Sequence, residues 1–151
     1  MISHDSIERL GARFAPFGPL ALRIGLGAVF VAHAYAKAAI FTFPGTQAFF
    51  EANGFPGWTA YPVFLAELFG GLALITGFRT RLVSLALIPV MLGALKPHLA
   101  NGWMFTGTGG GWEYVAFLII ALVAQVFVGS GALSADEALA KTGRAPLPAT
   151  T

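Results

Sequence analysis

Six ionisable side chains lie in or beside apolar stretches of this sequence, where a charge is costly unless it has a partner. They are His33, Lys37, Glu67, Lys96, His98 and Glu113. Glu67 interrupts an apolar stretch, and a carboxylate at membrane depth costs about 2.5–3.5 kcal/mol on insertion scales. A carboxyl group beside a histidine is equipped to take up and release protons. We therefore predict Glu67, His33 and His98 as the residues of a catalytic, proton-transferring site.

The composition indicates that the elements carrying these residues are surrounded by lipid. Of the 151 residues, 56% are hydrophobic and only 11% are charged, and the mean hydropathy is +0.74. A soluble domain carries about 25% charged residues. The net charge of +2, without a basic cluster among aromatic residues, does not suggest nucleic acid as a partner. The absence of cysteine excludes a disulfide, a thiolate metal site and a dithiol relay within this chain.

Four apolar stretches are long enough, or nearly so, to cross about 30 Å of hydrocarbon. They lie near residues 20–41, 61–77, 82–99 and 112–128. We therefore predict an all-α integral membrane four-helix bundle at residues 20–136. An interfacial segment, residues 1–19, is expected before it, and a tail at 137–151, disordered at its end, is expected after it.

The distribution of lysine and arginine sets the expected orientation. Arg79 and Arg81 occupy the turn between the second and third stretches, whereas the loops 42–60 and 100–111 contain neither lysine nor arginine. This pattern predicts a multi-pass protein of the inner (plasma) membrane with both termini in the cytoplasm. The sequence around His33 resembles a signal-peptidase site, but Arg23 interrupts the preceding apolar run.

With this topology, all four spans bring a charge or an imidazole to the same level near the outer face. The three tryptophans and three tyrosines map to that side as well, and flat aromatic walls beside charged groups suit a planar ligand. A structural interpretation stays open beside this one. Each charge of the right sign at a helix end stabilises the helix by about 0.3–1 kcal/mol through its interaction with the helix dipole. The two lysines and two glutamates could also simply pair, in either combination.

Several further features are expected to be structural. We predict a salt bridge between Arg23 and Asp136 at the inner end of the bundle. A short surface helix is expected at residues 7–14, and another after Thr46 as a cap, ending at Gly54. Small residues that allow close helix contacts are Gly25, Gly27, Gly70 and Gly71.

The order and spacing of these residues resemble those of the DoxX family of small membrane proteins, which includes membrane subunits of thiosulfate–quinone oxidoreductase. The resemblance runs from about residue 20 to 136 and rests on Arg23, His33-Ala-Tyr-Ala-Lys37, Ala66-Glu67, Gly70-Gly71-Leu72, Thr80-Arg81, His98, Gly110-Gly111-Trp112-Glu113-Tyr114 and Ser134-Ala-Asp136. Ala34 departs from the pattern, where a glycine is expected. The resemblance implies a four-helix membrane bundle and an association with quinone-linked or oxidative-stress redox systems.

One hypothesis is a quinone-linked redox subunit with its site near the outer face. Glu67 would relay protons with His33, and electrons would come from a partner or a small reductant, because no residue type in this chain carries electrons unaided. The residues expected to bind the membrane quinone are Lys37, Lys96, Trp103, Trp112 and Glu113, with His98 as a further donor.

The alternative hypothesis is a non-enzymatic scaffold that anchors a redox or oxidative-stress enzyme. Its expected partners are membrane lipid, an extracytoplasmic or membrane redox protein, and a second copy of the chain. Neither metal nor haem is expected, because lysines at the level of the histidines repel a cation and no helix carries an HxxxH or ExxH pair.

Overall fold

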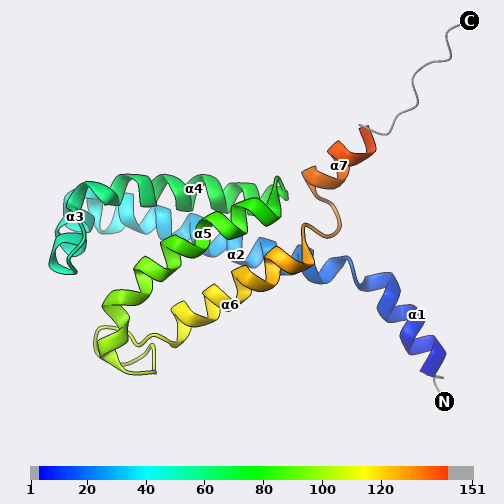
Figure 1. Ribbon diagram of the computed structural model, residues 1–151, viewed down its shortest axis with the longest axis horizontal. Helices are drawn as coiled ribbons and strands as arrows, with labels where there is room; N and C mark the ends of the chain where they lie inside the picture. Colours follow the sequence, from blue (N-terminus) through cyan, green and yellow to red (C-terminus); the bar gives the residue numbers. More distant parts are fainter. Residues whose placement is uncertain (1–3, 143–151) are drawn as a thin grey trace, which may run out of the picture.

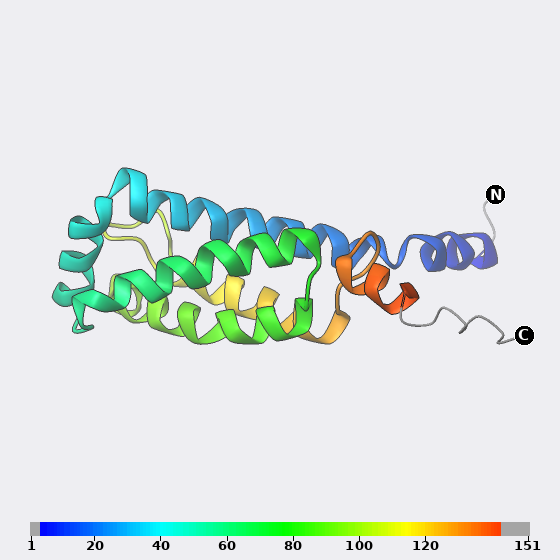
Figure 2. The same ribbon diagram turned by 90° about the horizontal axis from the view of Figure 1, so that it is seen from above.

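The computed structural model describes residues 4–142, and within that part every regular element is a helix. Helices α2 (Phe17–Tyr35), α4 (Ala60–Thr76), α5 (Thr80–Leu95) and α6 (Glu113–Val128) pack side by side (Figures 1 and 2). Helix α2 packs mainly against α4, and α5 mainly against α6; α4 also contacts α5, and α2 contacts α6. The four helices therefore share one core.

Three shorter helices flank this core. Helices α1 (His4–Phe14) and α7 (Ala135–Thr142) extend from one end, and α3 (Thr42–Ala52) lies at the other (Figure 1). A π-helical turn, Ala36–Ile40, joins α2 to α3, and 3₁₀ turns at Gly57–Thr59 and Lys96–Asn101 precede α4 and follow α5. Helix α3 begins at Thr42, so the expectation that Thr46 caps it is wrong; Thr46 is buried inside the helix.

Three helical segments are long and apolar enough to cross a membrane by length and composition. They are Phe17–Ile40, Gly57–Thr76 and Thr80–Asn101. The fourth expected span corresponds to α6, which is equally apolar but has only 16 residues. Large apolar side chains on the outer faces of these helices are exposed, including Phe69, Phe117 and Phe127. Such faces suit contact with lipid rather than water.

The centre of the core depends on a close contact between α2 and α4. A Cβ atom added at Gly27 would lie 2.6 Å from the carbonyl oxygen of Gly71, and one added at Gly71 would lie 2.8 Å from that of Gly27. Only glycine permits this approach, as the sequence predicts for small residues in membrane helices. Gly25 has no such neighbour. Around the contact, Phe30, Leu74 and Leu122 are almost completely buried.

One end of the core is closed by Arg23, which is 1% exposed. Its Nε donates to the carbonyl of Ser130 at 2.9 Å. Its Nη1 donates to the carbonyls of Leu74 at 3.1 Å and Ile75, and its Nη2 donates to those of Ala132 at 3.0 Å and Leu133 at 2.8 Å. The guanidinium thus satisfies carbonyls at the C-terminal end of α4 and in the loop after α6.

The expected salt bridge between Arg23 and Asp136 does not form. The Asp136 carboxylate instead accepts hydrogen bonds from the backbone N–H groups of Arg79, at 2.7 Å, and Thr80, at 3.1 Å. These are free donors at the start of α5, and a carboxylate there is favoured by both hydrogen bonding and the helix dipole. We call this region, with Arg23, Arg79, Arg81 and the loop 129–134, the arginine end.

Candidate functional site

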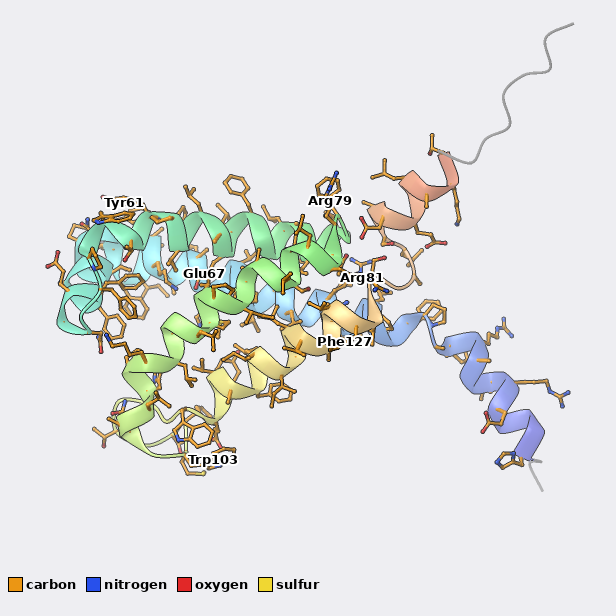
Figure 3. The ribbon with its side chains drawn as sticks, viewed as in Figure 1. Tyr61, Glu67, Arg79, Arg81, Trp103 and Phe127 are labelled. Carbon is orange, nitrogen blue, oxygen red and sulfur yellow. The ribbon has the colours of Figure 1, made fainter. Side chains whose placement is uncertain are left out.

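The opposite end of the core contains a cavity of about 780 Å³. Its wall is built from α2, the π-helical turn, α3, α4, α5, the turn after α5, and α6. We call this region the cavity end. Figure 3 shows Tyr61 and Trp103 at this end and Arg79 and Arg81 at the other, with Glu67 between them and closer to Tyr61. The wall is mostly apolar and rich in phenylalanine: Phe30, Phe41, Phe49, Phe50, Phe55 and Phe105.

Four of the predicted site residues line this cavity: His33, Lys37, Glu67 and His98. Lys37 and Glu67 form an ion pair in which Nζ lies 2.8 Å from Oε1 and 2.7 Å from Oε2. The side chains are 16% and 6% exposed, respectively. Lys37 comes from the π-helical turn and Glu67 from the middle of α4. The short, forked contact offsets the cost of removing two charges from water.

The two histidines make the same kind of contact from different helices. Nδ1 of His33 lies 2.8 Å from the carbonyl oxygen of Val29, and Nδ1 of His98 lies 2.8 Å from that of Gly110. A carbonyl oxygen only accepts, so each Nδ1 carries a hydrogen and donates it. In the neutral form of the ring, the other nitrogen, Nε2, then carries the lone pair.

The remaining predicted residues lie outside the cavity. Lys96 places Nζ 4.6 Å from the centre of the Phe55 ring, a cation–π contact behind the cavity wall. Trp103 and Trp112 meet edge to face, with ring centres 4.5 Å apart. Together with Glu113 they line a separate, shallow groove of about 590 Å³.

Glu113 has a structural partner in this groove, because its Oε1 accepts the backbone N–H of Phe105 at 3.0 Å. The groove and the cavity are neighbours, since Phe105 and Tyr114 line both. The structure thus brings His33, Lys37, Glu67 and His98 to one cavity and leaves the two tryptophans beside it.

Helix α3 and Asn53, the residue directly after it, contribute side chains that the sequence did not single out as part of the site. Thr46 lines the cavity and donates from Oγ1 to the carbonyl of Lys37 at 3.2 Å. Asn53 also lines it and donates from Nδ2 to the carbonyl of Phe49 at 2.8 Å. The only sequence signal was the expected short helix around Phe49 and Phe50, which did not indicate that this helix covers the site.

No metal-binding arrangement stands out among residues 4–142, where no three histidine, aspartate or glutamate side chains gather closely enough to hold an ion. An organic ligand fits the cavity better, because pockets for such ligands are mostly apolar with a few placed polar groups.

Comparisons with known proteins place the chain among membrane proteins. The DoxX family model matches residues 18–107, which include α3, α4, α5 and all but the first residue of α2. The chain is 34% identical over 134 residues to "Inner membrane protein YqjF" of Escherichia coli (strain K12), covering 82% of this chain and 93% of that protein. It is 29% identical over 125 residues to "Putative oxidoreductase CatD" of Bacillus subtilis (strain 168), covering 79% of this chain and 84% of that protein.

No solved structure matches the chain significantly. The family match covers more than half of the sequence, and the alignments to the two relatives cover 79% and 82% of it. Together with three helices able to span a bilayer, they identify this chain as a multi-pass inner-membrane protein that belongs to the DoxX family.

Proposed function

We propose that this protein is a quinone-linked redox subunit and that the cavity of about 780 Å³ is its quinone site. The observation that carries the proposal is the combination of an aromatic, apolar wall with the Lys37–Glu67 pair and two histidines. The cavity volume lies within the range of about 300–1,000 Å³ that is usual for small-molecule pockets. The name of one relative, "Putative oxidoreductase CatD", agrees with this class of function.

Each polar group has a role in this proposal. Lys37 lies within the wall and retains an N–H for a quinone oxygen, where negative charge develops on reduction. Glu67 holds the ammonium group in place and exchanges protons with His33. The phenylalanine rings of α3, with Phe41 just after the π-helical turn, pack against the planar head group. Electrons come from a partner protein or a small reductant, because no residue of this chain carries them.

The proposal includes a membrane arrangement. Helices α2, α4, α5 and α6 form a four-helix bundle that crosses the bilayer, with both termini in the cytoplasm and the cavity near the outer face. The arginines gathered at one end and the apolar surface of α6, packed on α5 and α2, support it. A lipid-soluble quinone would then enter from the outer leaflet.

The test is a binding titration of the full chain in lipid nanodiscs with a short-chain quinone. Quenching of Trp103 and Trp112, whose groove adjoins the cavity, reports binding. We expect saturable quenching that Glu67→Gln weakens by tenfold or more. The matched control is Glu51→Gln, which makes the same change on the exposed part of α3, outside the cavity. Quenching that equals that of a lipid-anchored tryptophan, or that both variants share with the wild type, would overturn the proposal.

One observation favours the alternative, a scaffold that anchors a redox or oxidative-stress enzyme. Lys37 and Glu67 form an ion pair within the chain, so neither charge needs a ligand as its counter-ion. A scaffold should co-purify with one enzyme in fixed proportion after crosslinking in the native membrane, and the Glu67→Gln variant should keep that partner. If no protein is recovered in fixed proportion, the scaffold function is contradicted.

A further inference from the structure

Most hydrogen-bond donors in the cavity wall already have a partner inside the protein. Polar residues from α2, the π-helical turn, α3 and the residue after it, the turn before α4, and the turn after α5 each donate to an acceptor of the chain itself. The donors with such partners are His33 Nδ1, Lys37 Nζ, Thr46 Oγ1, Asn53 Nδ2, Thr59 Oγ1 and His98 Nδ1. Their acceptors are five backbone carbonyls and the Glu67 carboxylate. Lys37 and Asn53 keep a further N–H group, and Tyr114, which carries a hydroxyl group, also lines the cavity.

The acceptors of the same wall are left available. Because Nδ1 of His33 and of His98 donates to a carbonyl, Nε2 is the acceptor of each ring in its neutral form. The hydroxyl oxygens of Thr46 and Thr59, which donate their hydrogens elsewhere, keep lone pairs as well. The wall therefore offers more acceptors than donors to an occupant.

A quinone and a hydroquinone differ in this respect. A quinone carbonyl only accepts hydrogen bonds, whereas each hydroxyl group of a hydroquinone also donates one. A buried acceptor that meets another acceptor stays unsatisfied, and this lowers affinity much more than a neutral contact does.

We propose that the cavity binds the reduced form, an aromatic diol, in preference to the quinone, and that Nε2 of His33 and Nε2 of His98 accept hydrogen bonds from its hydroxyl groups. This inference rests on the proposed function and specifies the redox state that the site favours. Lys37 and Glu67 remain paired beside the ligand, and the phenylalanine walls accommodate either ring equally.

The test compares three probes that share one ring. They are a tail-free benzoquinone, its hydroquinone, and the dimethyl ether of that hydroquinone, which keeps the oxygens but has no donors. Each is titrated anaerobically by calorimetry against the full chain in nanodiscs. We expect the hydroquinone to bind at least tenfold more tightly than the other two. A tenfold preference also raises the midpoint potential of the bound couple by about 30 mV above that of the free couple.

Two variants test the histidines individually. In His98→Asn the amide nitrogen can still donate to the carbonyl of Gly110, but the acceptor corresponding to Nε2 is lost; His33→Asn makes the same change beside Val29. Each should weaken hydroquinone binding by tenfold or more and change quinone binding less than twofold. Glu51→Gln is the control and should change neither.

The outcomes separate this inference from the proposed function. Quinone binding that equals or exceeds hydroquinone binding would overturn the preference while leaving the quinone site in place. A dimethyl ether that binds as tightly as the hydroquinone would do the same. Absence of saturable binding by all three probes would overturn the proposed function itself.

Discussion

The two ends of the helical core both bury a charge, but they satisfy it in different ways. At the arginine end, Arg23 is 1% exposed and donates to five backbone carbonyls. At the cavity end, the Glu67 side chain is 6% exposed and its partner is a single side chain, Lys37. Five main-chain acceptors surround the first charge on several sides, whereas the second is held from one direction and borders a cavity of about 780 Å³.

The protein is packed tightly around Arg23 and more loosely around Glu67, which borders the cavity. A Cβ atom added at Gly77 would lie 2.5 Å from Cβ of Ser134 and 3.0 Å from Cζ of Arg23, so the arginine end is filled to contact. Gly77 also has φ of +69°, which closes α4 with a left-handed residue. A buried charge that is held by main-chain groups, such as Arg23, can therefore complete the packing of its region. A buried charge that is held by one side chain, such as Glu67, can leave room for a ligand beside it.

The largest expected effect comes from Arg23→Lys. Lysine keeps the charge but has one nitrogen where arginine has three, so several buried carbonyls lose their donor. We expect a loss of more than about 3 kcal/mol in the free energy of unfolding, measured by circular dichroism during denaturation in detergent. Arg13→Lys, on the exposed surface of α1, is the control and should have no measurable effect. If the two variants unfold alike, the carbonyl contacts of Arg23 do not hold this end together.

The second largest loss of stability should come from a substitution at the close contact between α2 and α4, where Gly27 meets Gly71. Gly71→Ala places a methyl group against the backbone of α2, which cannot yield as a side chain could, so the helices must separate. We expect a loss of about 3 kcal/mol, the upper part of the range for overpacking. Gly25→Ala, where no atom lies within 4 Å, should be tolerated. Equal stability of the two variants would contradict the close approach of α2 and α4.

Breaking the Lys37–Glu67 ion pair should lower the free energy of unfolding by less than the Arg23→Lys substitution does. Lys37→Met or Glu67→Leu alone leaves one charge without its partner, but the adjoining cavity gives water access to it. We expect a loss of about 1–2 kcal/mol for each, and recovery of most of it in the double variant, because an apolar pair can replace a buried ion pair. A double-mutant cycle of unfolding free energies measures this coupling. Losses that simply add would mean that the two side chains do not interact.

The smallest effect should come from an exposed pair near the arginine end. Nζ of Lys141 donates a hydrogen bond to Oε1 of Glu137 at 2.7 Å, and this hydrogen bond lowers the pKa of Glu137. A lowered carboxyl pKa stabilises the fold at pH values above the ordinary one, and that contribution disappears as the pH falls to the lowered value. In Lys141→Ala, the pKa of Glu137 should rise toward its ordinary value in an NMR titration, while thermal unfolding at neutral pH stays the same. An unchanged pKa would contradict this contact.

Much of the fold could be predicted because hydropathy and small residues report membrane helices directly. The stretches 20–41, 61–77 and 82–99 correspond to the long helical segments, and Gly27 and Gly71 form the expected close contact. The partner of Arg23 could not be predicted correctly. Backbone carbonyls are present at every residue, so a side chain that binds them leaves no complementary charge in the sequence.

The residues of the candidate site could be predicted from the sequence only in part. His33 and Lys37 stand one helical turn apart, and both line the cavity with Glu67 and His98. The sequence left open which lysine pairs with which glutamate, because helix rotation and tilt decide this and periodicity does not record them. It also gave no reason to separate Trp103 and Trp112 from the cavity, since residues at the same depth can lie on different sides of one helix.

The π-helical turn Ala36–Ile40 adds one residue between Lys37 and the helix that covers the cavity. Its signature is the hydrogen bond from the N–H of Phe41 to the carbonyl of Ala36, at 2.8 Å, which spans five residues instead of four. Removing Ala39 would shorten this connection by one residue and change how α3 is placed against the rest of the cavity wall. The position of Phe49 and Phe50 relative to Lys37 would then change although no residue of the cavity wall had been replaced. The register of this one turn, as much as the identity of any side chain, determines whether the cavity has a lid.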